Sequence, residues 1–94
     1  MTQRETDVLN RHARAERLQL ARKWRTFRRE ALLTQVHLAE LCRISRRTVQ
    51  MVESGEITPR VSTQRRFLTL VATFEHGGME TWLKWIQNKS PVRA

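Results

Sequence analysis

The feature that most constrains this chain is a pair of short helical patterns, at residues 34 to 55, with almost no chain between them. Thr34 opens the first pattern and Ser45 opens the second. Each hydroxyl can accept a hydrogen bond from an amide one turn later and so cap a helix. Only Arg43 and Ile44 separate the two patterns, which is too short for antiparallel packing. The two helices are therefore expected to cross steeply.

The facing sides of the two patterns are apolar, with Leu38 and Ala39 in the first and Val49 and Val52 in the second. Ala39 is small enough for close helix approach. This arrangement predicts a helix-turn-helix, whose second helix is held out to enter the major groove of DNA. The alternative is an ordinary helical hairpin with a solvated basic face. On the first interpretation the groove-facing residues are Arg46, Arg47, Gln50 and Met51.

Several residue pairs in and around this segment follow a known pattern. They are Phe27-Arg28, Thr34-Gln35, Leu38-Ala39, Ile44-Ser45, Thr48-Val49, and Glu53 followed by Gly55. In these residues the chain resembles the Cro/CI-type helix-turn-helix, the lambda-repressor-like or XRE family, over roughly residues 18 to 86. The resemblance implies an all-α fold, with a five-helix lambda-repressor-like DNA-binding domain and, here, an N-terminal helical extension. It also implies a partly buried ion pair between Arg28 and Glu53.

The turn between the two helices departs from the family pattern. The family usually carries glycine there, and this chain carries Arg43. A non-glycine residue in the left-handed conformation costs roughly 1 kcal/mol. We therefore expect a turn that is slightly strained or differently shaped.

The expected DNA contacts divide into those that read bases and those that position the protein. Arg46 and Arg47, in the first turn of the second helix, suit bidentate contacts to guanine. Met51 suits a thymine methyl group, and Gln50 suits adenine or a phosphate. The resemblance implies that Gln35 bonds a phosphate, and amides near Ser54 and Gly55 are expected to clamp a second stretch. The full set expected at phosphates is Thr34, Gln35, Ser45, Thr48, Ser54, Gly55 and Arg60.

The charge of the chain favours a nucleic-acid partner. Eighteen basic and nine acidic residues give a net charge of +9, and most of the basic residues are arginine, whose planar fork suits phosphate and guanine edges. Double-stranded DNA is favoured over RNA because no aromatic residue is expected on the basic face for base stacking. A membrane surface could also attract the charge, but the sequence shows no long apolar run and no signal peptide.

The residue types that carry catalysis or metal binding are sparse. His12, His37 and His76 are scattered and lack partners at metal-ligand spacings. No Gly-rich phosphate loop or catalytic triad order is present. The lone Cys42 is interpreted as a core residue and fits a reducing cytoplasm. We therefore expect no enzyme activity, no cofactor and no metal.

The chain before Gly55 contains no glycine or proline, so its first half is helix-permissive. Thr6-Asp7 is expected to cap a first helix that runs from about residue 7 to 31 or breaks near Arg14 to Arg17. Its buried stripe is expected at Leu20, Trp24, Phe27 and Ala31, with Leu9 and Ala13 extending it backward. The expected division is a basic extension at 1–16, helical or arm-like, a DNA-binding domain at 17–90, and a loose C-terminus at 91–94.

Two further helices are expected at about 63–75 and 79–88, separated by Gly77-Gly78. On the last one, the apolar arc spans about 160° at 100° per residue, more than a small core requires. Two tryptophans on one side of such an arc are typical of an interface anchor. The arc therefore predicts a homodimer interface at Met79, Trp82, Trp85 and Ile86. Packing on the core is the alternative for the tryptophans. The alternative dimer surface is the extension, through Val8, Leu9 and Leu18.

These observations predict a sequence-specific DNA-binding transcriptional regulator in the cytoplasm, associated with the nucleoid when bound to DNA. A repressor that binds an inverted-repeat operator as a homodimer is the favoured form. The alternative is the antitoxin of a toxin–antitoxin pair, which binds a toxin protein and autoregulates its operon.

Overall fold

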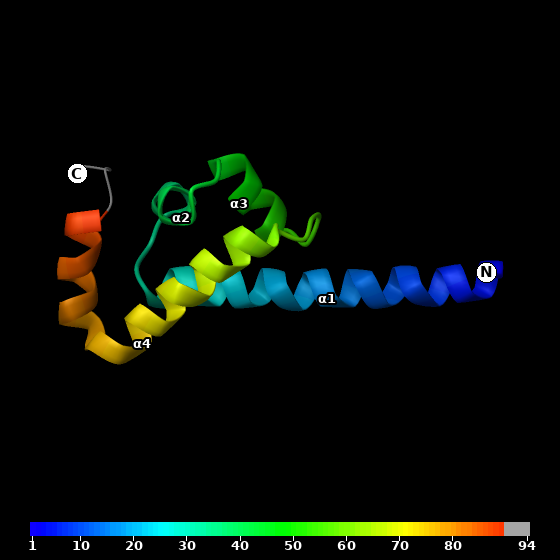
Figure 1. Cartoon of the computed structure of the whole chain (residues 1–94), viewed down its shortest axis with the longest axis horizontal. Coiled ribbons are helices and arrows are strands. Elements are labelled where there is room, and N and C mark those ends of the chain that lie inside the picture. The colour runs from blue at the N-terminus through cyan, green and yellow to red at the C-terminus, as the bar shows by residue number, and fades with distance from the viewer. Residues whose placement is uncertain (90–94) are drawn as a thin grey trace.

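The protein is all-helical in the computed structural model, which describes residues 1–89 (Figure 1). The elements in chain order are α1 (Gln3–Glu30), α2 (Gln35–Cys42), α3 (Arg46–Glu53) and α4 (Val61–Lys89). No strand occurs in this range. The all-α prediction is therefore confirmed. The loose C-terminus predicted at 91–94 lies outside the described residues.

Helix α1 begins earlier than the sequence predicts and is unbroken. Thr2 caps it, because the Thr2 hydroxyl accepts from the Glu5 amide at 3.2 Å and the Thr2 amide donates to the Glu5 carboxylate at 3.4 Å. Such a reciprocal capping box satisfies two amides that a helix otherwise leaves free. The predicted start at Thr6-Asp7 and the possible break at Arg14 to Arg17 are thus both wrong. With 28 residues, α1 is about 42 Å long.

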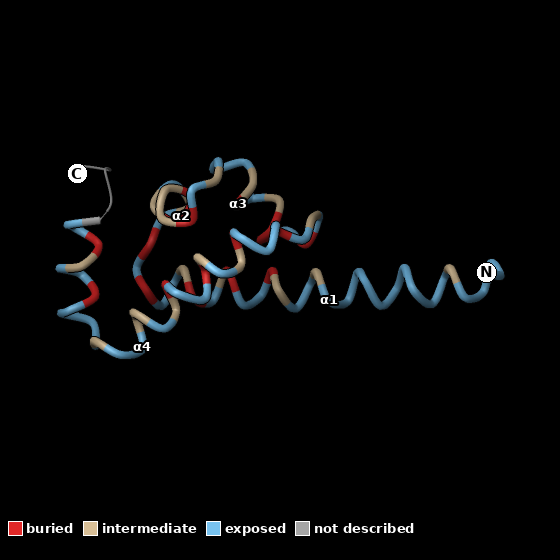
Figure 2. The backbone as a smooth tube through the Cα atoms, viewed as in Figure 1, coloured by how far each residue is buried: buried red, intermediate tan, exposed pale blue. Residues whose placement is uncertain are grey.

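The first half of α1 projects away from the rest of the molecule (Figure 1). Almost every residue from 1 to 16 is exposed (Figure 2). Leu9 and Ala13 are among them, so the prediction that they continue the buried stripe is wrong. The periodicity is present, but no other helix lies against this half of α1 to cover it.

The core lies between the second half of α1, the α2–α3 pair and α4. Trp24 stacks on Phe67 with ring centroids 4.6 Å apart, and Phe27 meets Phe67 edge-on at 5.3 Å. Leu38 and Val49 close the other side and are fully buried. Aromatic pairs of this kind add stabilisation beyond the area that they bury.

Cys42 belongs to this core, as the sequence predicts. Burial raises the pKa of its thiol to about 12, although the nearby Arg66 guanidinium acts in the opposite direction. The thiol is therefore neutral near pH 7 and packs as a small apolar side chain.

The predicted count of five helices is not confirmed, because the segments expected at 63–75 and 79–88 form the single element α4. Gly78 lies inside it with φ 70° and ψ 172°, which is not a helical conformation. Helix α4 bends sharply in its second half (Figure 1). Gly78 thus forms a kink between two helical stretches that together make up α4.

The segment after Gly78 packs against the core. Trp82 is fully buried, and its indole Nε1 donates to the Ala31 carbonyl at 2.9 Å. Ile86 is also buried, and Trp85 stacks on Trp82 with centroids 5.3 Å apart. The prediction that Trp82 and Ile86 form a dimer interface is therefore wrong: these side chains fill the space beside the end of α1. Met79 and Leu83 remain on the surface.

The Gly78 conformation gives a test of the bend. Gly78→Ala should destabilise the fold by about 1–3 kcal/mol, because this backbone region is almost restricted to glycine, although a Cβ would meet no atom within 4 Å. Thermal unfolding measures the loss. His76→Ala, at an exposed helical position two residues away, should stay within about 0.5 kcal/mol of wild type. Equal stability of the two variants would show that the bend does not depend on Gly78.

Candidate nucleic-acid interface

The α2–α3 pair is fixed by two side-chain caps, as predicted. The Thr34 hydroxyl accepts from the His37 amide at 3.0 Å, and the Ser45 hydroxyl accepts from the Thr48 amide at 3.1 Å. Both cap residues have extended backbones. Each cap satisfies an amide that would otherwise be free at the start of a helix.

The turn between the helices is made by Arg43 in the left-handed conformation, with φ 58° and ψ 47°. Its amide donates to the Glu40 carbonyl at 3.1 Å, and the Ile44 amide donates to the Ala39 carbonyl at 2.9 Å. This pair of bonds is that of a helix C-cap usually made by glycine. Arg43 therefore adopts a left-handed conformation that costs more free energy for arginine than for glycine.

Helix α3 has one buried and one exposed side. Val49 and Val52 are fully buried, whereas Arg46, Arg47 and Gln50 are exposed and Met51 is half-buried. All four side chains of the predicted base-reading set are thus at least partly accessible. Their role in reading bases remains a prediction.

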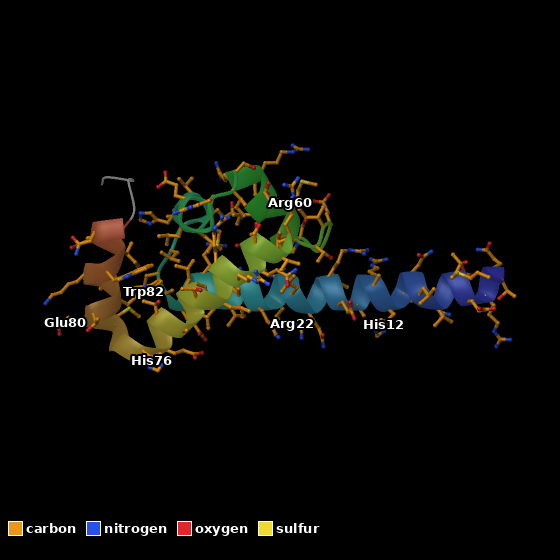
Figure 3. All side chains as sticks on the ribbon, viewed as in Figure 1. His12, Arg22, Arg60, His76, Glu80 and Trp82 are labelled. Carbon is orange, nitrogen blue, oxygen red and sulfur yellow. The ribbon has the colours of Figure 1, made fainter. Side chains whose placement is uncertain are left out.

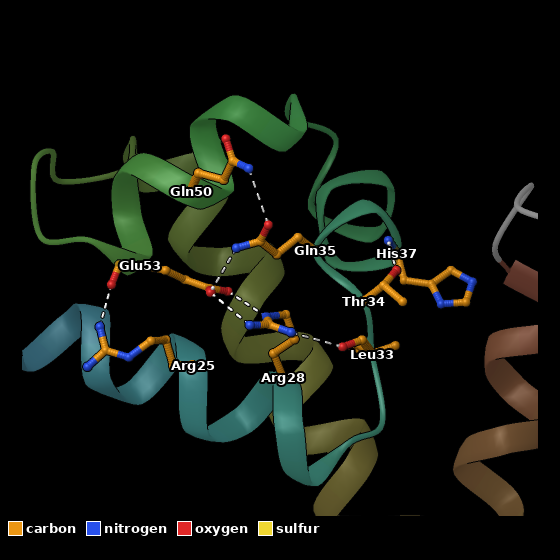
Figure 4. A network of polar contacts seen from close by, with 8 residues as sticks. All are labelled: Arg25, Arg28, Leu33, Thr34, Gln35, His37, Gln50 and Glu53. Atoms are coloured by element: carbon orange, nitrogen blue, oxygen red, sulfur yellow. Dashed lines mark hydrogen bonds and ion pairs between the residues drawn. The ribbon is translucent and has the colours of Figure 1, made fainter.

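An ion pair joins α3 to α1. Arg28 Nε donates to Glu53 Oε2 at 2.7 Å and Arg28 Nη2 donates to Glu53 Oε1 at 3.1 Å (Figure 4). The side chains are 18% and 5% exposed, respectively. Two parallel bonds of this kind also fix the relative orientation of the groups. The pair is the one that the family resemblance implies.

Further polar contacts surround this ion pair (Figure 4). Gln35 Nε2 donates to Glu53 Oε1 at 3.3 Å, and Gln50 Nε2 donates to Gln35 Oε1 at 3.4 Å. The Arg25 guanidinium donates to the Glu53 carbonyl. The sequence did not indicate the roles of Arg25 and Gln35 in this network, because both residues are polar and give no periodic signal.

The segment after α3 differs from expectation. The Ser54 amide donates to the Gln50 carbonyl at 3.0 Å and the Gly55 amide donates to the Val52 carbonyl at 3.1 Å. Gly55 is buried with φ 78°, and a Cβ there would lie 2.8 Å from Leu18 Cδ2. The expected phosphate clamp by these two amides therefore does not hold, because both amides are used within the protein.

The remaining predicted phosphate residues flank α3. Thr34, Ser45 and Arg60 are exposed, and Gln35 and Thr48 are half-buried. Arg60 lies in the segment that precedes α4, close to α3 (Figure 3). No group of metal-ligating side chains occurs among residues 1–89. No helix in the same range is long and apolar enough to cross a membrane.

Two short capped helices with a tight turn, the second held outward, define a helix-turn-helix DNA-binding architecture. The sequence model of the family described as "Helix-turn-helix domain" matches residues 19–76. The chain belongs to this helix-turn-helix family, and its residues are consistent with the Cro/CI or XRE type. No curated protein and no solved structure matches the chain.

The ion pair predicts a measurable loss of stability. Arg28→Ala should lower the free energy of unfolding by about 3 kcal/mol, because it leaves the buried Glu53 carboxylate without its partner. Chemical denaturation measures this loss. Arg29→Ala removes the same charge from an exposed neighbour and should change stability by less than about 0.5 kcal/mol. If both variants unfold like wild type, the pair contributes nothing to the fold.

Proposed function

We propose that this protein is a sequence-specific transcriptional regulator, a repressor that binds an inverted-repeat operator as a homodimer in the cytoplasm. The observation that carries the proposal is that α3 is fixed on one side and exposed on the other. Its inner side is fixed by Val49, Val52 and the buried Glu53, while Arg46 and Arg47 extend into solvent from its first turn. A rigid helix with free arginines at its N-terminal end suits the major groove.

Base reading is assigned to α3. Arg46 and Arg47 reach guanine edges through bidentate bonds, and Met51 lies against a thymine methyl group. Gln50 reads adenine or a phosphate. Its side chain already bonds Gln35, so the two glutamines enter the DNA contact as a pre-ordered unit. Such ordering reduces the entropy lost on binding.

Positioning is assigned to residues on both sides of α3. Gln35, at the start of α2, and the Thr34 and Ser45 caps lie next to helix ends, where free amides and the helix dipole favour an anion. Thr48 and Arg60 contact the backbone on the other side. These contacts set the register of the protein on DNA and carry no base preference.

An antitoxin is the second candidate function. A groove of about 530 Å³ lies between α1 and α4. Its lining includes Phe67, Leu68, Val71 and Phe74, together with charged residues of both helices. Leu68 is largely exposed. An open apolar groove favours a protein partner. A toxin-like gene adjacent to this one would favour the antitoxin, and its absence would favour the simple repressor.

The division between reading and positioning predicts different losses for two arginines. Arg46→Ala should cost about 1–3 kcal/mol on the cognate site and relax preference at one base pair. Arg60→Ala should weaken binding to cognate and random DNA about equally. The test is to measure the binding constants of both variants on cognate and on random DNA. If Arg46→Ala loses equal affinity for the two DNAs, Arg46 does not read bases.

The homodimer predicts the spacing of the operator. Two copies related by a twofold axis should contact half-sites about 34 Å apart, or about 10 base pairs. With Trp82 and Ile86 buried, we assign the axis to the projecting half of α1. Leu9→Glu should give monomers and weaken operator binding. Leu83→Glu, an exposed control on α4, should not. Sedimentation distinguishes the variants, and a monomeric wild type on and off DNA would contradict the dimer.

A further inference from the structure

The segment that leaves the end of α3 is bonded to the middle of α1 (Figure 1). Arg17 Nε donates to the Gly55 carbonyl at 3.1 Å, a contact between residues 38 positions apart in the chain. Arg17 is also the one residue between positions 7 and 19 that is not exposed. Its side chain therefore lies against the rest of the molecule, while its neighbours on α1 face solvent.

Leu18 lies against the same glycine. A Cβ at Gly55 would lie 2.8 Å from Leu18 Cδ2, so Leu18 occupies the space into which a larger residue would extend. Gly55 also has φ 78°, a conformation that glycine adopts without steric cost. Arg17 thus holds the carbonyl of Gly55, and Leu18 covers the side of its Cα.

Two other arginines of α1 hold the last residue of α3. The Arg25 guanidinium donates to the Glu53 carbonyl, and Arg28 pairs with the Glu53 carboxylate (Figure 4). At about 100° per residue, Arg17, Arg25 and Arg28 lie within about 80° on one side of α1. Carbonyls at the C-terminal end of a helix lack partners within the helix and attract cationic donors. Helix α1 therefore holds the end of α3 at two residues, Glu53 and Gly55.

The two points of attachment differ in origin. Arg25 and Arg28 lie within residues 19–76, which match the helix-turn-helix family, whereas Arg17 and Leu18 precede them. The attachment at Gly55 is therefore an addition to the part of the chain that matches the family.

A second point of attachment matters because α3 is short. It has eight residues, so its first and last residues lie about 10 Å apart along the axis. A rotation of about 10° about Glu53 would move Arg46 by about 2 Å. A shift of this size breaks a hydrogen bond, and a bidentate contact with guanine needs two such bonds at once. The attraction of basic residues to phosphates falls off more slowly with distance.

We propose that Arg17 and Leu18 are positioning residues for base recognition. They hold the segment after α3 and so fix the angle at which α3 enters the major groove. The inference rests on the proposed function, because it takes α3 as the base-reading helix. Neither residue contacts DNA in this arrangement. Their loss should therefore reduce the preference for the cognate site and leave the electrostatic attraction to any DNA unchanged.

Arg17→Ala removes the bond to Gly55. It should lower the affinity for the cognate site by about fivefold to tenfold, and the affinity for random DNA by less than about twofold. The slope of log K against log salt should stay the same, because no phosphate contact is lost. Leu18→Ala should lower the ratio of cognate to random affinity in the same direction. Affinities are measured at a temperature at which circular dichroism shows every variant to be folded.

Two further variants separate the hydrogen bond from the charge. In Arg17→Gln the side-chain amide nitrogen lies as many bonds from Cα as arginine Nε does, so a donor remains while the charge is lost. This variant should keep most of the cognate preference of wild type. Arg14→Ala removes the same charge from an exposed residue of α1 that forms no ion pair with another described residue. It should leave the ratio of cognate to random affinity unchanged.

A measurement without DNA reports the orientation of α3 directly. Residual dipolar couplings of backbone amides give the orientation of α3 relative to α1. In Arg17→Ala, the couplings of α3 should depart from those of wild type when the couplings of α1 are used as the reference frame. In Arg17→Gln and Arg14→Ala they should match wild type.

The proposal is overturned if the α3 couplings of Arg17→Ala match wild type, or if its ratio of cognate to random affinity matches that of Arg14→Ala. Equal losses on both DNAs with a shallower salt slope, not restored by Arg17→Gln, would also overturn it, because Arg17 would then be a phosphate contact. If wild type prefers no DNA sequence, the repressor assignment fails, while the couplings still decide whether Arg17 fixes α3.

Discussion

The burial of Glu53 is the constraint on which the arrangement of the DNA-binding surface depends. A carboxylate that is 5% exposed is stable only if charged or polar groups replace its water. Arg28 from α1 and Gln35 from α2 provide these groups. Because the three residues come from three helices, satisfying one carboxylate also fixes the direction in which α3 leaves the core.

The helix-turn-helix could be predicted from sequence because its signals are local. The two caps, the two-residue turn and the apolar pairs all lie within 22 residues, and the structure contains each of them. The predictions that failed concern contacts between distant segments. Leu9 has the spacing of a buried residue and no helix to cover it. Trp82 lies on a wide apolar arc, and only the fold shows that the end of α1 occupies that side.

The candidate site shows the same difference between local features, which the sequence predicts, and features that depend on distant segments. The pattern of exposed residues on α3 follows from helical periodicity, so Arg46, Arg47 and Gln50 could be identified without coordinates. The proposed phosphate contacts could not be identified in this way, because they depend on which amides remain free after the chain has folded. Ser54 and Gly55 use theirs within the protein.

The bond from the Trp82 indole to the Ala31 carbonyl connects residues 51 positions apart. Contacts between distant residues form late, since the intervening chain must first be ordered. During synthesis the ribosome releases α1, α2 and α3 before the segment after Gly78 emerges. Until then the apolar side of α1 around Phe27 and Ala31 lacks part of its cover. The nascent chain therefore carries α3 before Trp82 completes the core beside the end of α1.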